Sequence, residues 1–238
     1  MPKIKIDKNI FSKKASWSFG KNIAPKFDNH IKKSVPMYKD SQWLCKELSD
    51  YFVKENSIIY DIGCSTGSFL KQIAIRHKAK KNVKYYGIDI VKQMITYAKK
   101  YNKIKNIEFL NKDIKKFKLK KNDFTISFYT LQFINQNYRQ AMINKIYKNL
   151  NWGGAFFFAE KVRSYDARTQ DMMNEIYKEW KYNNGFSNEE INSKTKSLKG
   201  VLDPFSTKGN LELLKRAGFK DISTVAKFVC FEVFLAIK

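Results

Sequence analysis

Short apolar runs alternate along the chain with longer amphipathic stretches. The runs are rich in Ile, Tyr and Phe and predict strands near residues 58–62, 83–89, 107–110, 124–129 and 155–160. The stretches between them predict helices at 68–76, 92–101 and 138–149, the last stopped by Asn151-Trp152-Gly153-Gly154. Strands that alternate with helices indicate an α/β fold with a doubly wound, mostly parallel Rossmann-like sheet.

The alternation is interrupted by residues 164–198, where the pattern is wholly helical. Asp166 and Ser187 are the expected N-caps of two helices, because their side-chain oxygens accept from free backbone N–H groups. Asn183-Asn184-Gly185 is the expected turn between those helices. We expect this helical pair to form a lid or a subunit contact.

The chain returns to a helix ending at Arg216-Ala217-Gly218-Phe219 and finishes with strand patterns near 222–226 and 228–237. No internal repeat or Pro-rich linker separates these parts. We therefore expect a single domain over residues 1–238. It has an N-terminal arm with helices in residues 1–50 and a helical insertion in residues 164–200.

Composition sets the outer bounds of the fold and its environment. Hydrophobic residues make up 43% of the 238 residues, enough for a large core. The three cysteines are widely spread, which argues against a disulfide framework and for a reducing compartment. The N-terminus lacks the apolar core of a signal peptide, and no segment is long enough to span a bilayer. We expect a cytoplasmic protein with no membrane contact.

The formal net charge of +24 would attract polyanions such as RNA or DNA. Lysine carries nearly all of this charge, because the chain has only five arginines. Specific nucleic-acid sites depend on the bidentate arginine fork. The composition therefore predicts at most a weak, salt-sensitive contact with tRNA or another nucleic acid.

Candidate chemistry begins where the apolar run Ile58–Ile62 breaks into the small-residue loop Gly63-Cys64-Ser65-Thr66-Gly67 before a helix. Ligands of α/β sheets bind outside the carboxyl ends of the parallel strands, beside helix N-termini with free N–H groups. Gly63 and Gly67 let the backbone approach a ligand without a Cβ in the way. This layout predicts a nucleotide-sized pocket.

Two acids follow at the ends of the next two predicted strands. Asp89 is placed to accept both ribose hydroxyls, and its charge repels a ribose phosphate. Asp113 is expected to accept from an adenine amine, with Ile90 and Ile114 as apolar walls for the ring. Together with the glycine loop, these residues predict a site for S-adenosylmethionine (SAM).

Other interpretations of the loop are weaker. It fits the G-x-S-x-G nucleophile elbow of hydrolases, but that triad needs a late histidine, and the chain has only His30 and His77. Ser65 and Ser68 stand where a dinucleotide fingerprint needs glycines, and the Lys-Ser/Thr ending of a P-loop is absent. A plain strand-to-helix turn without ligand remains an alternative. With two histidines and no Cys-x-x-Cys pair, no metal site is expected.

Several segments resemble the carboxy-S-adenosyl-L-methionine (carboxy-SAM) synthases, a family with the class I SAM-dependent methyltransferase fold. The resemblance covers nearly the whole chain. Its motifs are Phe27-Asp28-Asn29-His30, Ser34-Val35-Pro36-Met37-Tyr38, Tyr60-Asp61-Ile62-Gly63-Cys64-Ser65, Tyr129-Thr130-Leu131-Gln132-Phe133, Ala159-Glu160-Lys161 and Asn184-Gly185-Phe186-Ser187.

The resemblance implies a homodimer that binds SAM or carboxy-SAM without a metal. In that family prephenate donates carbon dioxide to a sulfonium ylide of SAM, and the product feeds a partner enzyme that modifies wobble uridine in tRNA. The residues that the resemblance assigns to the cofactor site are Tyr38, Gly63, Cys64, Ser65, Asp89, Ile90, Asp113 and Ile114. We expect Asp61 and Phe128 to line the same site.

The chain departs from the family pattern at two positions. The arginine expected to hold a carboxylate is replaced by Thr195, and an asparagine before the Thr-Leu-Gln-Phe segment is replaced by Phe128. Lys194 and Lys196 are the candidate replacements for the arginine, although a lysine is a point charge without the bidentate fork.

Three hypotheses remain open at this point. The first is a carboxy-SAM synthase whose carboxylate clamp is rebuilt with lysine. The second is a methyltransferase that uses plain SAM on a small-molecule or nucleic-acid acceptor, since methyl transfer needs mainly an in-line approach to the methyl group. The third is a non-catalytic binder of SAM or carboxy-SAM. The residues do not identify a general base.

Overall fold

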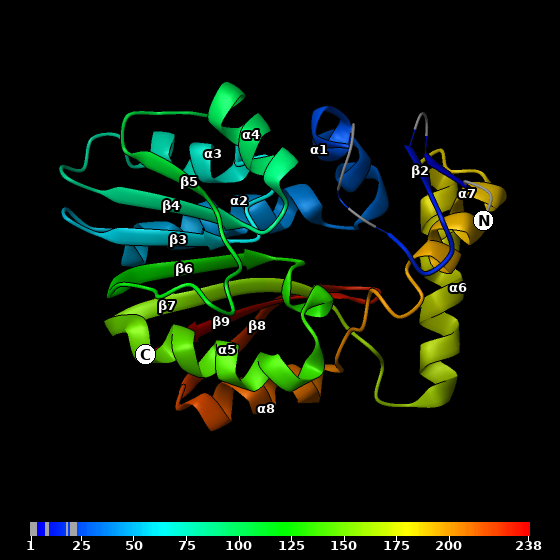
Figure 1. Cartoon of the computed structure of the whole chain (residues 1–238). Coiled ribbons are helices and arrows are strands. Elements are labelled where there is room, and N and C mark those ends of the chain that lie inside the picture. Colours follow the sequence, from blue (N-terminus) through cyan, green and yellow to red (C-terminus); the bar gives the residue numbers. More distant parts are fainter. Residues whose placement is uncertain (1–3, 8–9, 18, 20–22) are drawn as a thin grey trace.

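Seven strands form one mixed sheet in the computed structural model, which describes residues 4–7, 10–17, 19 and 23–238. The strands are β3 (Ile58–Ile62), β4 (Lys84–Asp89), β5 (Ile107–Asn111), β6 (Asn122–Phe128), β7 (Leu150–Lys161), β8 (Asp221–Phe228) and β9 (Phe231–Ile237). Their order is β5-β4-β3-β6-β7-β9-β8 (Figure 1). The first five are parallel, whereas β9 runs antiparallel to β7 and β8. This confirms the predicted doubly wound, mostly parallel sheet.

Helices cover both faces of the sheet (Figure 1). They are α1 (Ala24–Ser34), α2 (Tyr38–Phe52), α3 (Ser68–Arg76), α4 (Lys92–Tyr101), α5 (Gln136–Asn149), α6 (Ala167–Asn183), α7 (Asn188–Ser197) and α8 (Thr207–Ala217), with the short 3₁₀ helix η1 (Leu131–Phe133). Helices α2, α3 and α4 lie on one face, and α5 and α8 lie on the other. Helices α6 and α7 stand beyond the end of the sheet.

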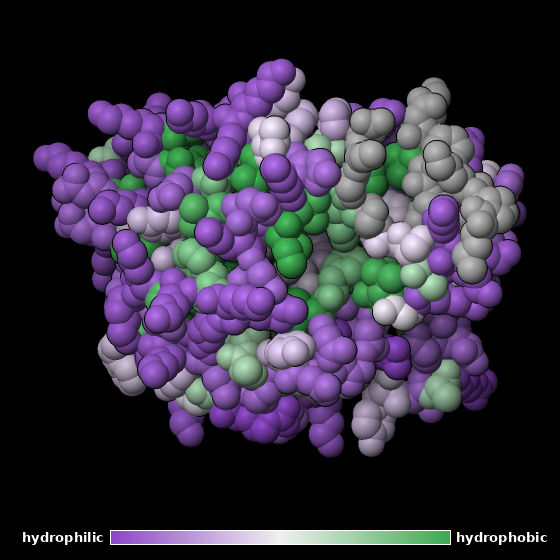
Figure 2. Space-filling view, viewed as in Figure 1, coloured by the Kyte–Doolittle hydropathy of each residue, from purple (hydrophilic) through white to green (hydrophobic). Residues whose placement is uncertain are grey.

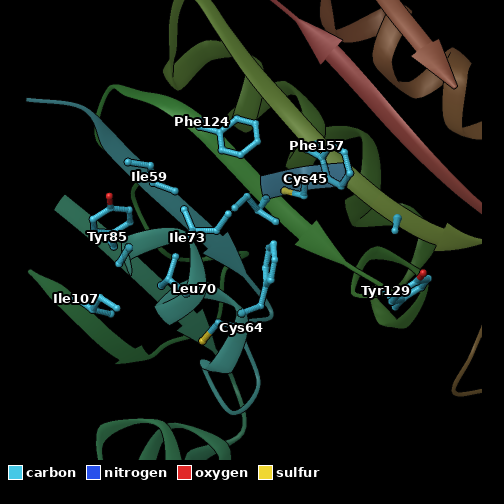
Figure 3. Close-up of a cluster of buried hydrophobic side chains, with 14 of the residues drawn as sticks. Cys45, Ile59, Cys64, Leu70, Ile73, Tyr85, Ile107, Phe124, Tyr129 and Phe157 are labelled. Atoms are coloured by element: carbon cyan, nitrogen blue, oxygen red, sulfur yellow. The ribbon is translucent and has the colours of Figure 1, made fainter. Parts of the chain in front are cut away.

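Strand β7 shows how the two cores are separated. Side chains alternate between the faces of a strand, so Phe156 and Phe158 pack toward α5 and α8, whereas Phe157 packs on the opposite face. Figure 3 shows Phe157 beside Cys45 of α2. Because all three phenylalanines are buried, the continuous apolar run in the sequence reflects a strand covered on both faces.

Most predicted element boundaries agree with the structure. Helices α3 and α4 have the predicted bounds. Asp166 caps α6 by accepting from the Thr169 N–H at 2.9 Å, and Ser187 forms a capping box with Glu190. Gly218 ends α8 with φ +113°, a conformation that favours glycine.

The predicted turn over Asn151-Trp152-Gly153-Gly154 is the main boundary error. In the structure α5 ends at Asn149, as predicted, but β7 already begins at Leu150. Asn122 of β6 pairs with Leu150 and Phe124 pairs with Ala155, so the register shifts there. The four residues therefore form an irregular start of the strand rather than a loop before it.

The N-terminal arm contains a hairpin that the sequence pattern did not predict. Strands β1 (Ile4–Asp7) and β2 (Ile10–Ser12) pair antiparallel, and β1 contacts α7. Farther along, the backbone N–H groups of Ala15 and Trp17 donate to carbonyls of α7. Each strand is too short to give an alternating signal in the sequence. The position of the hairpin depends instead on packing against the helical insertion.

Among the described residues, no helix has the length and apolar composition needed to cross a bilayer. The three cysteines are buried free thiols. Burial raises the pKa of Cys45 and Cys64, which keeps these thiols protonated and unreactive.

Candidate functional site

The loop between β3 and α3 requires its two glycines. Gly63 and Gly67 have φ of +75° and +71°. A Cβ on Gly63 would lie 2.0 Å from Oγ1 of Thr130, and one on Gly67 would lie 2.3 Å from the Phe109 ring. The Gly63 N–H donates to the carbonyl of Ile88 at the end of β4, 2.7 Å away. The loop is thus pressed against the carboxyl ends of the neighbouring strands, where α/β sheets bind ligands.

Asp89 is held by the backbone of both adjacent loops. Its Oδ2 accepts from the Ser65 N–H at 2.9 Å, and its Oδ1 accepts from the Val91 N–H at 2.8 Å. Burial raises the pKa of the Asp89 carboxyl, while these two hydrogen bonds lower it. Each carboxylate oxygen keeps a further acceptor position, so the geometry suits the pair of ribose hydroxyls expected from the sequence.

Asp61 lies deeper in the same region, on β3. It is 3% exposed, and burial together with the charge of Asp89 raises its pKa to about 7. Neighbouring acids make this part of the pocket electronegative, which suits the positively charged sulfonium of SAM.

The predicted adenine residues are brought together, with one correction. Ile90, Asp113 and Ile114 all line the cavity. However, β5 ends at Asn111, so Asp113 lies in the following turn, where it accepts from the Lys115 N–H at 2.9 Å. The side chain of Asn111, the last residue of β5, donates to the carbonyls of Asp89 and Ile90.

These residues surround one cavity of about 940 Å³, at the upper end of the size range of small-molecule sites. Its lining includes every residue that the sequence assigned to the cofactor site, from Tyr38 on α2 to Phe128 on β6. In Figure 2 apolar side chains meet at a hollow in the middle of this face, with hydrophilic side chains around it. The volume accommodates a nucleoside cofactor and a second small molecule.

The strand end of β6 forms an aromatic wall. Phe128 packs against Phe69 with ring centroids 4.9 Å apart and against Phe157 at 5.7 Å. Tyr129 has φ +54°, a left-handed conformation that is costly for an aromatic residue, and stacks on Tyr38 at 6.0 Å. Phe128 therefore replaces a polar amide with a packed apolar surface.

A buried acid holds the loop that follows this wall. The carboxylate of Glu160 accepts from the backbone N–H groups of Leu131 and Gln132, both at 2.9 Å. The side chain of Gln132 in turn accepts from the Lys161 N–H at 3.0 Å. The motif residues Gln132 and Glu160 thus have a structural role: they fix the Thr130 loop against the glycine loop.

The structure separates the two candidate replacements for the missing arginine. Lys194 and Thr195 line the cavity, whereas Lys196 is exposed and outside its lining. Residues two apart on a helix point about 200° away from each other, so the prediction for Lys196 was wrong. Thr195 donates to the Ile191 carbonyl of its own helix at 2.9 Å.

Sequence reasoning missed other cations that line the cavity. Lys161 at the end of β7 and Lys181 in the last turn of α6 both line the cavity. His30, part of the Phe27-Asp28-Asn29-His30 motif but predicted to have no role in the site, also lines it, and its Nε2 lies 2.7 Å from Nζ of Lys194. Lys161 belongs to the Glu-Lys motif, which was a usable signal, but nothing in the sequence singled out Lys181. No group of metal-ligating side chains occurs among the described residues.

Comparisons with known proteins agree with this geometry. A model of the methyltransferase domain family matches residues 53–218. The fold is similar to human N-acetylserotonin methyltransferase in complex with SAM (16% identity, TM-score 0.57, 91% of this chain and 53% of that chain). It is also similar to a putative SAM-dependent methyltransferase of Listeria monocytogenes (16% identity, TM-score 0.58, 84% of this chain and 99% of that chain). The fold and the site define a SAM-dependent transferase.

Named relatives extend along nearly the whole chain. The carboxy-S-adenosyl-L-methionine synthase of Staphylococcus epidermidis is 39% identical over 223 residues, 93% of this chain and 97% of that protein. That of Campylobacter lari is 37% identical over 235 residues, 96% of this chain and 98% of that protein. The chain belongs to the carboxy-S-adenosyl-L-methionine synthase family.

Proposed function

We propose that this protein forms carboxy-SAM from SAM and prephenate. The observation that carries the proposal is Lys194: it lines the same cavity as the glycine loop and Asp89, directly beside Thr195. A cation at this place can hold a carboxylate where the family has an arginine.

The proposed reaction balances without an added oxidant or reductant. Prephenate loses its ring carboxyl group as carbon dioxide and its ring hydroxyl group, and becomes phenylpyruvate. The SAM methyl carbon gives up one proton, which leaves with the hydroxyl as water, and forms a C–C bond to the carbon dioxide. The protein's part is to hold both molecules next to each other in one cavity so that carbon dioxide is captured before it escapes.

Mass spectrometry of the nucleoside after incubation of the purified protein with SAM and prephenate tests this function. A species heavier than SAM by one carbon dioxide, formed only when both substrates are present, is the expected product. SAM that stays unchanged under these conditions would contradict the proposal. Prephenate labelled with ¹³C in its ring carboxyl group shows whether the added carbon comes from that group.

A second candidate function is methyl transfer from plain SAM to a small-molecule or nucleic-acid acceptor. Phe128 and Thr195 favour it, because both remove polar groups that would contact a carboxylated methyl group. Methyl transfer would release S-adenosylhomocysteine once an acceptor is supplied. The same mass-spectrometric assay with total tRNA as acceptor distinguishes the two functions.

The assembly and the later fate of the product stay predictions. We propose a homodimer whose carboxy-SAM serves a tRNA-modifying partner enzyme, as the resemblance implies. The net charge of +24 favours weak contact with tRNA. Light scattering measures the oligomeric state. Filter binding at two salt concentrations measures the contact with tRNA.

A further inference from the structure

A second, smaller pocket lies between helices α1, α2 and α3, next to the SAM cavity. Its volume is about 320 Å³, and its lining comes from these three helices alone. Helix α2 packs against both α1 and α3, and the pocket occupies their junction. Tyr38, Gln42 and Ser68 line both cavities, so the two cavities share a wall. The proposed reaction does not use the smaller pocket.

Helices α1 and α3 each present a pair of polar side chains to this pocket. Asp28 and Lys32 on α1 are four residues apart, as are Ser68 and Gln72 on α3. Residues four apart lie on the same face of a helix. Because the face that a helix turns toward its neighbours is normally apolar, polar pairs at this junction indicate a binding pocket rather than a gap in the core.

Helix α2 adds a third polar face, with Lys39, Gln42 and Lys46 spaced three and four residues apart. Gln42 is the most informative of them, because it is only 8% exposed. Its side-chain amide has no hydrogen-bond partner in the part of the chain that the structure describes. A buried amide without a partner is costly. Gln42 therefore lines the pocket with its donors and its acceptor unused, which points to a ligand.

The pocket is positively charged and is not neutralised by its own residues. Its lining contains three lysines and one carboxylate, so its formal charge is two positive units. Within the described residues, no ion pair includes Lys32, Lys39 or Lys46. The single carboxylate, that of Asp28, already accepts from the Thr66 hydroxyl at 2.8 Å. The pocket therefore attracts an anion.

These lysines are separate from the cations of the larger cavity. Lys161, Lys181 and Lys194 line the larger cavity but not this pocket. Burial lowers the pKa of Lys181 to about 8 and that of Lys194 to about 7. Lys32 and Lys39, in contrast, are exposed. The smaller pocket is thus open to a ligand that arrives from solvent without passing through the SAM cavity.

The hydrogen-bond donors of the pocket fit a phosphate group better than a carboxylate. Each ammonium group has three N–H donors and each amide has two. Three lysines and the amides of Gln42 and Gln72 therefore offer more donors than the two oxygens of a carboxylate accept. A phosphate monoester has three terminal oxygens and a charge of about −1.5 to −2 at pH 7. Ser68 is the first residue of α3, so the positive end of that helix dipole also lies at the pocket.

From this arrangement we infer that the junction of α1, α2 and α3 is a phosphate-binding pocket. Lys32, Lys39 and Lys46 bind the phosphate oxygens, together with the amide of Gln42. The inference goes beyond the proposed function, because that reaction needs no phosphate. The phosphate belongs either to a small phosphorylated molecule or to the backbone of an RNA. Both present the same oxygens, and the experiment separates these two sources.

Titration of inorganic phosphate into the full-length protein, followed by ³¹P nuclear magnetic resonance at constant ionic strength, tests the pocket. The protein is saturated with S-adenosylhomocysteine, so the SAM cavity is occupied. We expect saturable binding to the wild type. Affinity should fall at least about fivefold in Lys32→Met and in Lys39→Met, as is typical for loss of one charge-assisted contact. Phosphate that binds only when S-adenosylhomocysteine is absent would overturn the inference, because the site would then be the amino-acid end of the SAM pocket.

The matched control is Lys33→Met, which removes the same charge from the neighbouring residue of α1. Lys33 is exposed and lies outside the lining of both pockets. Consecutive residues of a helix point about 100° apart, so phosphate affinity should stay unchanged in this variant. Equal losses in Lys33→Met and Lys32→Met would show that net charge attracts the phosphate, and would overturn the inference. The thermal midpoint of every variant checks that it is folded.

Two competitors identify the source of the phosphate. A nucleoside 5′-monophosphate carries a phosphate monoester, whereas an oligoribonucleotide without terminal phosphates carries only phosphodiesters. If the monophosphate displaces inorganic phosphate and the oligoribonucleotide does not, the pocket binds a small phosphorylated molecule. If the oligoribonucleotide displaces it, and Lys32→Met but not Lys33→Met weakens that binding, the pocket holds the backbone of an RNA. Displacement by neither competitor would mean an adventitious ion only and would overturn the inference.

Discussion

Replacing Asp89 by asparagine tests the ribose-binding assignment with almost no change in side-chain volume. In the structure both carboxylate oxygens accept from a backbone N–H, from Ser65 at 2.9 Å and from Val91 at 2.8 Å. The amide nitrogen of asparagine would face one of these donors and could not accept from a ribose hydroxyl. The variant therefore loses one acceptor for the backbone and one for SAM.

The size of the effect follows from these contacts. A hydrogen bond to a charged group contributes about 1.5–3 kcal/mol, so SAM affinity should fall about 10- to 150-fold. Asp89→Ala should lose more, because both side-chain acceptors disappear and the N–H groups of Ser65 and Val91 lose their partner.

Calorimetry with S-adenosylhomocysteine and its 2′-deoxy and 3′-deoxy analogues isolates the ribose contacts. In the wild type each deoxy analogue should bind more weakly than the parent compound. In Asp89→Asn at least one of these penalties should vanish, because its acceptor is gone. Asp123→Asn is the matched control: Asp123 also accepts from a backbone N–H, that of Ile58 at 2.9 Å, but it lies outside the cavity lining. Wild-type SAM affinity in Asp89→Asn, or unchanged penalties for both analogues, would refute the assignment.

Two further predictions concern the loop and the pH dependence. Gly67→Ala should lower the free energy of unfolding and abolish SAM binding, because the new Cβ would lie 2.3 Å from the Phe109 ring. Gly185→Ala, with φ +86° but nothing within 4 Å of the new Cβ, should lower the free energy of unfolding by only about 1 kcal/mol and leave SAM binding intact. Denaturant melts and calorimetry compare the two variants. Equal losses of stability and of SAM affinity would contradict the steric argument. Prephenate affinity should be highest below pH 7 and fall as pH rises through the pKa values of Lys194 and Lys181, about 7 and 8, because only the ammonium forms attract the carboxylate. Titrations between pH 5.5 and pH 9 check this, and a flat profile would argue against lysine recognition.

The sequence by itself determined the α/β class and the cofactor loop. Apolar runs of strand length between amphipathic stretches leave few alternatives to a sheet covered on both faces. The bounds of a helix such as α3 follow from the residues at its own ends, and they agree with the prediction. Gly63, Gly67 and Asp89 were also identifiable, because their roles depend on backbone geometry at a strand end, which a local pattern records.

Only the tertiary structure decided which cations reach the cavity. Lys161, Lys181 and Lys194 are spread over β7, α6 and α7, and they look alike among the many lysines of this chain. Lys196 was an equally good candidate in the sequence, but the turn of α7 directs it away from the cavity. The β1–β2 hairpin that places Asp7 behind His30 was invisible for a similar reason, since its strands are defined by packing on α7. Long-range packing, which no local pattern encodes, brings these groups together.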